Sequence, residues 1–186
     1  LLEIPYKVSK RDEEEGSSSF DVAFGYTGSY SAIAGGLLAA KVTSDVFEDV
    51  IKEYKFDLTD TALFRVAFLS DDFEGGDDEL YINIFDPSGK KVDGQRIFSP
   101  AVGGATPTFL IDVILPEDGL YTVEVEYYAI EGKSITYDLY TWRIPPKKGG
   151  SLSVDSAPLA AELGETGTVK FSWEGATAGE WYLGGI

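Results

Sequence analysis

Apolar residues in this chain recur at every second position over most of its length. Residues 20–26 carry Phe20, Val22, Phe24 and Tyr26 in alternation with smaller or polar residues, and residues 121–127 repeat the pattern. A period of two places these side chains on one face of a β-strand. Turn sequences separate the runs, and no series of helices alternates with them. The sequence therefore predicts an all-β fold, an antiparallel β-sandwich or jelly roll.

One segment departs from this period. Apolar residues recur at helical spacing at Val46, Phe47, Val50 and Ile51. Asp45 and Glu48 are placed as a capping box at the start of such a helix. We therefore expect at most one short helix, within residues 45–54.

The turn and linker sequences suggest how the 186 residues are divided. Residues 41–144 carry enough regular strands for one jelly-roll domain, and residues 1–40 are expected to be an N-terminal connecting segment with one or two strands. The sequence PPKKGG at 145–150 cannot extend a sheet and predicts a linker. Residues 151–186 contain strands but are too few to hold a core alone. They are expected to dock on the main domain or to begin a truncated second β-domain.

The charge and apolar patterns exclude two kinds of partner. The net charge of −17 at pH 7 repels phosphate backbones, and the basic residues form no stripe, so we expect no binding to nucleic acid. No apolar run approaches the length of a membrane-spanning helix, so we expect no membrane insertion.

Several residue types are missing or rare. The chain has no Cys, His or Met, and its single Asn and Gln are Asn83 and Gln95. Depletion of thermolabile side chains is typical of proteins from hyperthermophiles. Without His and Cys the chain cannot assemble a Ser-His-Asp triad, a Cys-His pair or a histidine-based zinc site. A first residue other than Met, with no signal-like segment, suggests a piece of a longer chain.

Six of the nine residues at 71–79 are acidic. Like charges about 5 Å apart repel by roughly 3 kcal/mol at an effective dielectric near 20, so a folded loop of this kind favours a cation. Calcium accepts oxygen ligands in irregular loops, and the glycines at 75–76 would let the acids converge. The predicted calcium ligands are Asp71, Asp72, Asp77 and Asp78. A solvated loop without an ion is the alternative.

A weaker acidic cluster and an aromatic cluster are the other candidate sites. Asp57 and Asp60 form the weaker acidic cluster, and Asp118 lies in a turn that its side chain alone could explain. Aromatic residues near one another in two strands could make a stacking platform for a ligand, or could be covered core. They are Tyr127, Tyr128, Tyr137, Tyr140 and Trp142.

Two strand-and-turn sequences resemble a known family. LYINIFDPSGK at 80–90, followed by PEDGLYTVEV at 116–125, resembles the bacterial and archaeal pre-peptidase C-terminal domain. VKFSWEG at 169–175 and WYLGGI at 181–186 are similar to the C-terminal extension of pyrolysin-like subtilases of hyperthermophilic archaea.

The resemblance implies a β-jelly-roll appendage of a secreted or cell-surface subtilisin-like serine protease. Such a domain is non-catalytic, holds calcium, adds thermal stability and helps to engage a protein substrate. Its partner is the catalytic domain of the same parent chain, and no position here matches the family's catalytic residues. The alternatives are a binding module for insoluble protein or polysaccharide and a cell-surface or S-layer attachment module.

Overall fold

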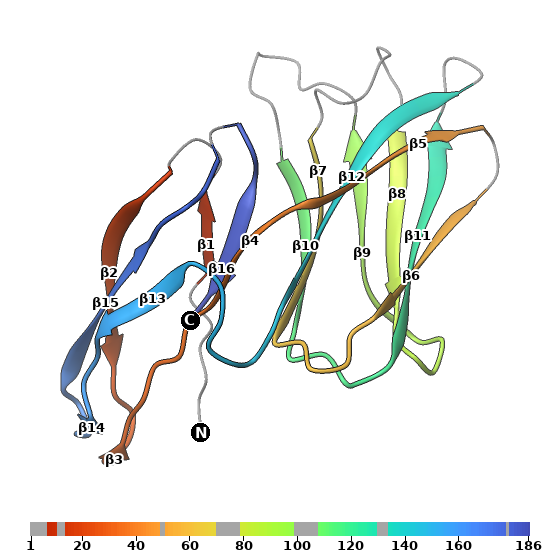
Figure 1. Cartoon of the computed structure of the whole chain (residues 1–186). Helices are drawn as coiled ribbons and strands as arrows, with labels where there is room; N and C mark the ends of the chain where they lie inside the picture. The colour runs from red at the N-terminus through yellow and green to blue at the C-terminus, as the bar shows by residue number, and fades with distance from the viewer. Residues whose placement is uncertain are drawn as a thin grey trace. The chain divides into compact units, whose positions relative to one another are not determined.

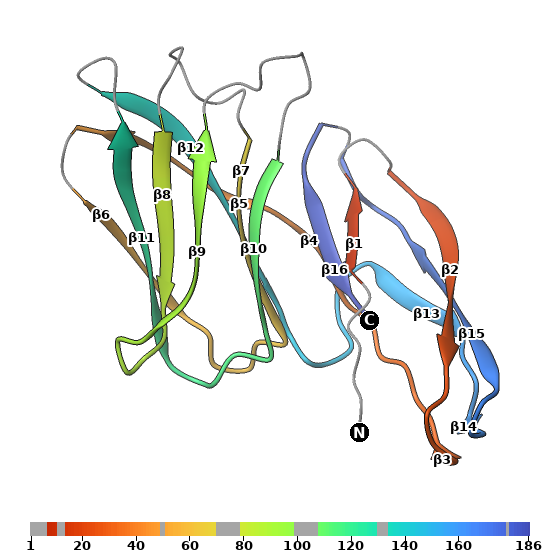
Figure 2. The same cartoon turned by 180° about the vertical axis from the view of Figure 1, so that it is seen from behind.

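The chain forms two compact units built from strands. The computed structural model describes residues 7–10, 14–48, 51–69, 79–98, 108–129, 134–177 and 179–186. One unit comprises Leu1–Ala40 and Ile144–Ile186, and the other comprises Lys41–Arg143. Figures 1 and 2 show the strands from opposite sides. The predicted all-β fold class is confirmed. Within the described ranges, no helix has the length and apolar character needed to cross a membrane.

The unit Lys41–Arg143 is an eight-stranded sandwich. Its strands are β5 (Lys41–Phe47), β6 (Lys52–Asp57), β7 (Leu63–Leu69), β8 (Glu79–Phe85), β9 (Lys91–Phe98), β10 (Thr108–Ile114), β11 (Leu120–Ala129) and β12 (Ile135–Ile144). One sheet has the order β10-β7-β12-β5 and the other has β6-β11-β8-β9. Counted from β5 as the first strand, these orders are 6-3-8-1 and 2-7-4-5. Two Greek keys wound in this way make a jelly roll.

The core of the jelly roll lies between its two sheets. Alternate residues of β7, β8, β11 and β12 point inward, as the period of two requires. The buried residues are Phe47, Leu58, Phe64, Val66, Phe68, Leu80, Ile82, Ile84, Ile111, Tyr121, Val123, Val125, Ile135, Tyr137 and Leu139. Burying one large apolar side chain stabilises a fold by roughly 1.5–3 kcal/mol, so this cluster is the main source of the unit's stability.

The expectation of at most one short helix holds, since the described residues of 45–54 contain none. Residues Lys41–Phe47 form β5 and Lys52–Asp57 form β6. Burial in β5 alternates up to Phe47, which is buried, while Val46 is exposed. The Asp45 carboxylate does not cap a helix but accepts hydrogen bonds from Lys52 and Tyr54 of β6, the strand that follows in the chain and belongs to the other sheet. Pairing across strands, which the local sequence does not reveal, overrides the helical spacing.

The other unit combines both ends of the chain. Its strands are β1 (Lys7–Lys10), β2 (Gly16–Ala23), β3 (Gly28–Ser29), β4 (Gly35–Ala39), β13 (Leu152–Ser156), β14 (Ala160–Ala161), β15 (Thr166–Trp173) and β16 (Tyr182–Gly185). The sheets have the orders β1-β16-β4, β13-β15-β2 and β14-β3. In Figure 1 the red strand β2 therefore lies beside the blue strand β15.

This unit has its own apolar core, supplied by both ends of the chain. Its buried residues are Ala34, Leu37, Leu152, Phe171, Trp173 and Ala176, with Phe20, Val154, Tyr182 and Ile186 packed against them. Residues 1–40, read from the sequence as a connecting segment, supply four strands to it. The strands of 151–186 pair with β2, β3 and β4, and the segment read as a linker is bridged to β4 through Gly149 and Gly35.

Candidate functional site

The predicted calcium ligands Asp71, Asp72, Asp77 and Asp78 lie outside the described residues. The description of the chain stops at Leu69 and resumes at Glu79. Calcium binding by these four carboxylates therefore stays a prediction.

The carboxylates of Asp57, in the weaker acidic cluster, and of Asp118 accept hydrogen bonds from turn residues. Asp57 accepts bonds from the backbone N–H and the hydroxyl of Thr59, at 3.0 and 2.6 Å. These bonds lower the pKa of Asp57. Asp118 accepts a bond of 3.1 Å from the backbone N–H of Asp60. In the part of the chain that the structure describes, no group of three or more acidic side chains is arranged to hold a metal ion.

The two sequences that carry the family resemblance lie on neighbouring strands. β8 pairs with β11, and Phe85 lies opposite Thr122. After β8, the Asp86 carboxylate accepts hydrogen bonds from the Ser88 N–H and hydroxyl at 2.9 and 2.6 Å. Before β11, a Cβ at Gly119 would lie only 2.6 Å from Pro87 Cγ. The two turns thus pack together, which explains why this position needs a glycine.

The aromatic platform is wrong for Tyr137 and Trp142, which are both buried. Tyr137 is fully buried between the sheets, where its hydroxyl lies 2.6 Å from the hydroxyl of Tyr54. Tyr140 stacks on Trp142 with ring centroids 6.5 Å apart. The side chains of Tyr127 and Tyr128 lie outside the described part of the structure. Because cross-strand partners decide which aromatic rings are covered, the sequence alone could not separate platform from core.

Tyr137 belongs to a hydrogen-bonded chain that joins β5, β6 and β12. The Tyr54 hydroxyl donates to the Asp45 carboxylate at 2.7 Å, so it must accept from the Tyr137 hydroxyl. Burial works against ionisation of Asp45, but hydrogen bonds from Tyr54 and Lys52 outweigh it and hold the pKa of Asp45 below its ordinary value. Burial raises the pKa of Tyr137 to about 12. Burial and the hydrogen bond donated to Asp45 also raise the pKa of Tyr54. The chain fixes the packing of three strands at the edge of the sandwich.

The raised tyrosine pKa values predict a loss of stability in alkali. A neutral tyrosine is favoured in the fold, so its contribution is complete below its unfolded pKa of about 10. We expect the free energy of unfolding to fall as the pH rises from there toward the folded pKa of Tyr137, about 12. Urea unfolding at a series of pH values measures this. An unfolding free energy that is constant over that interval would contradict the buried chain of tyrosines.

Substitution of Tyr54 tests the same network at neutral pH. Tyr54→Phe removes the donor to Asp45 and the acceptor for Tyr137, and should lower the unfolding free energy by about 1–3 kcal/mol. Tyr26→Phe is the matched control, because among the described residues the exposed Tyr26 hydroxyl is bonded only to the backbone carbonyl of Ser29. Equal effects of the two substitutions in urea unfolding would show that the Tyr54 network adds nothing.

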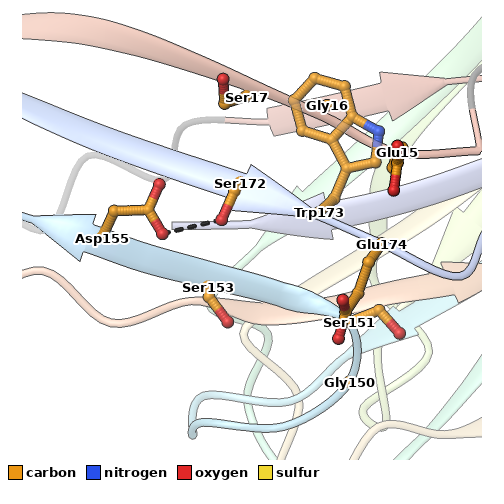
Figure 3. Close-up of a pocket in the computed structure, with 10 residues that line it drawn as sticks. All are labelled: Glu15, Gly16, Ser17, Gly150, Ser151, Ser153, Asp155, Ser172, Trp173 and Glu174. Atoms are coloured by element: carbon orange, nitrogen blue, oxygen red, sulfur yellow. Dashed lines mark hydrogen bonds between the residues drawn. The ribbon is translucent and has the colours of Figure 1, made fainter.

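A surface depression in the unit that combines both chain ends is the other polar feature (Figure 3). We call it the acidic depression. It is lined by Glu15, Gly16, Ser17, Gly150, Ser151, Ser153, Asp155, Ser172, Trp173 and Glu174, of which three are acidic, four are serines and none is basic. Its lining can donate and accept hydrogen bonds, and its charge favours a cationic ligand.

Strand register builds the acidic depression. Ser153 lies opposite Ser172, and Ser172 lies opposite Ser17, so one row of serines crosses the sheet β13-β15-β2. The Ser172 hydroxyl donates to Asp155 at 2.7 Å. The Trp173 ring covers Gly16, where any Cβ would collide with it. Sequence reasoning missed this site because its residues come from three distant segments. The serines that alternate with apolar residues in 151–155 were the available signal.

Comparison with known proteins gives no relative from which a function could be transferred. No protein-family model matches the chain. No curated protein matches it significantly.

Proposed function

We propose that this chain is a non-catalytic, calcium-stabilised accessory module of a secreted or cell-surface subtilisin-like serine protease from a hyperthermophile. Its principal partner is the catalytic domain of the same parent protein. Its role is to add thermal stability and to help engage protein substrate.

One observation carries this proposal. The strand order of β5–β12 is that of a jelly roll, the fold that the family resemblance implies. Within it, the two resembling sequences form paired strands, and their turns pack through Pro87 and Gly119. The resembling residues therefore serve to build this fold, which is what an accessory module requires of them. Fold alone does not assign function, so the proposal also rests on the resemblance of the sequences.

Calcium would act through linkage between binding and folding. An ion held by the folded form alone stabilises it by RT ln(1 + [Ca]/Kd), or about 2.7 kcal/mol at a hundredfold excess over Kd. The proposed ligands are the four aspartates of residues 71–78. Carboxylate oxygens of this kind suit calcium, and binding would also relieve their mutual repulsion.

Removal of calcium tests the proposal. We expect the melting temperature of the chain to fall by several degrees when calcium is replaced by a chelator. The variant Asp71→Asn with Asp77→Asn should melt at the same temperature in both buffers. The matched control is Asp57→Asn with Asp118→Asn, because these carboxylates make turn hydrogen bonds, and it should keep the calcium response. Identical melting of the unmodified chain with calcium and with chelator would refute the calcium part of the proposal.

A further inference from the structure

β2 is a long and unbroken sheet edge whose one charged side chain is that of Asp21. It is the last strand of the sheet β13-β15-β2, so its second edge presents backbone groups that no strand of this sheet pairs. Its register with β15 runs unbroken over eight residue pairs, from Gly16–Trp173 to Ala23–Thr166. The sequence GSSSFDVA contains no lysine and no proline. Natural proteins usually blunt such an edge with charge, proline or a bulge.

Three other described edge strands of this unit show such devices. β1 has a lysine at each end, Lys7 and Lys10. β13 has a register shift between Val154 and Ser156, where a bulge interrupts the edge. β4 is bridged by Gly149 on the side away from β16. Among the described strands of this unit, β2 therefore stands out as a template for a further strand.

The backbone geometry shows which groups of β2 face that free edge. The N–H of Phe24 donates to the carbonyl of Glu165 at 2.9 Å, so the backbone groups of Phe24 face the β15 side. Backbone groups alternate in direction along an edge strand of an antiparallel sheet. The positions that face away from β15, all with exposed side chains, are Ser17, Ser19, Asp21 and Ala23.

Charge decides which kind of strand this edge would accept. The start of β2 lines the acidic depression, whose described lining contains Glu15, Asp155 and Glu174 and no basic residue. A second copy of this chain would bring the same acidic residues, on a chain whose net charge is −17. A strand that carries lysine or arginine is attracted instead.

We propose that β2 binds an extended, basic segment of another protein, which adds to the sheet as a strand and places its lysine or arginine side chains against the acidic depression. Main-chain hydrogen bonds supply affinity in this mode, and side chains supply selectivity. The inference stands apart from the proposed calcium-stabilised role, because every residue that carries it lies in the other unit and none is a proposed calcium ligand.

The binding of a labelled peptide tests whether the free edge of β2 accepts a basic strand. The probe is a short fluorescein-labelled peptide of alternating lysine and valine, and its binding to the full chain is followed by fluorescence anisotropy. Ser19→Pro removes one outward N–H without touching the ladder to β15, so it should weaken binding about tenfold. Ser19→Ala keeps that N–H and is the matched control, expected to bind as the unmodified chain does. Circular dichroism verifies that both variants are folded.

Two altered peptides distinguish binding through strand pairing from binding through charge attraction alone. A peptide N-methylated at alternate residues keeps its charge but cannot pair as a strand, and should bind at least about tenfold more weakly. A peptide with glutamate in place of lysine should not bind measurably. Equal binding of the N-methylated and unmethylated peptides, or of Ser19→Pro and Ser19→Ala, would show mere attraction to an acidic protein and overturn the proposal. A concentration-dependent dimer that Ser19→Pro abolishes would overturn it in favour of a second copy.

Discussion

A chain that begins at Lys41 should keep the jelly roll and lose the other unit completely. Residues 1–40 supply β2, which pairs with β15 over its whole length, and β4, which pairs with β16. They also bring Ala34 and Leu37 to a core that Leu152 and Phe171 share. Without them, residues 151–186 keep two paired strands, β13 and β15, which are too few to fold alone.

A comparison of three lengths of the chain tests whether residues 151–186 need residues 1–40 in order to fold. Residues 41–143 alone should melt cooperatively and give dispersed amide signals, because they contain every described strand of the jelly roll and lack only Ile144, the last residue of β12. Residues 41–186 should show the same dispersed signals together with a second set typical of an unfolded chain. The full chain should show one fully dispersed set. If residues 151–186 remain ordered without the first forty, the unit does not depend on both ends of the chain.

The Arg65–Asp112 ion pair should give the largest effect of a single substitution. The guanidinium makes two bonds to the carboxylate, at 2.7 and 2.9 Å, and the two side chains are only 6% and 9% exposed. Arg65→Met would leave the buried Asp112 carboxylate without the guanidinium, and breaking a buried ion pair in this way typically costs about 3–5 kcal/mol. Urea unfolding should therefore show a large fall in the midpoint.

A double substitution distinguishes the cost of breaking the ion pair from the cost of removing both of its charges. Arg65→Met combined with Asp112→Leu removes both charges, and apolar replacements of buried pairs are often close to neutral. The double variant should therefore be more stable than Arg65→Met alone. The surface pair Lys55–Glu53, about half exposed, is the matched control, and Lys55→Met should change stability by less than about 1 kcal/mol. A double variant less stable than Arg65→Met would contradict the burial argument.

The period of two predicted the strands because burial on one face is a local property of a sequence. It placed Phe64, Val66 and Phe68 on the same inward face of β7, where the structure has them. The helical spacing at 46–51 gives no helix in the described residues, because Asp45 has its hydrogen-bond partner Tyr54 on β6 and a spacing rule does not reveal that contact.

Features that depend on distant segments could not be read from the sequence. Ser18 and Phe171 lie opposite one another although more than a hundred residues separate them, so local patterns do not reveal that the two ends form one unit. The acidic depression was missed for the same reason. Tyr137 looked available as a binding surface because only its partner Tyr54, on another strand, shows that it is covered.

An anomalous-scattering map from crystals grown with calcium tests the proposed stabilisation of this chain by a calcium ion among four clustered aspartates. We expect a peak within coordination distance of carboxylate oxygens of Asp71, Asp72, Asp77 and Asp78. A well-ordered loop whose carboxylates face solvent, with no peak among them, would contradict it.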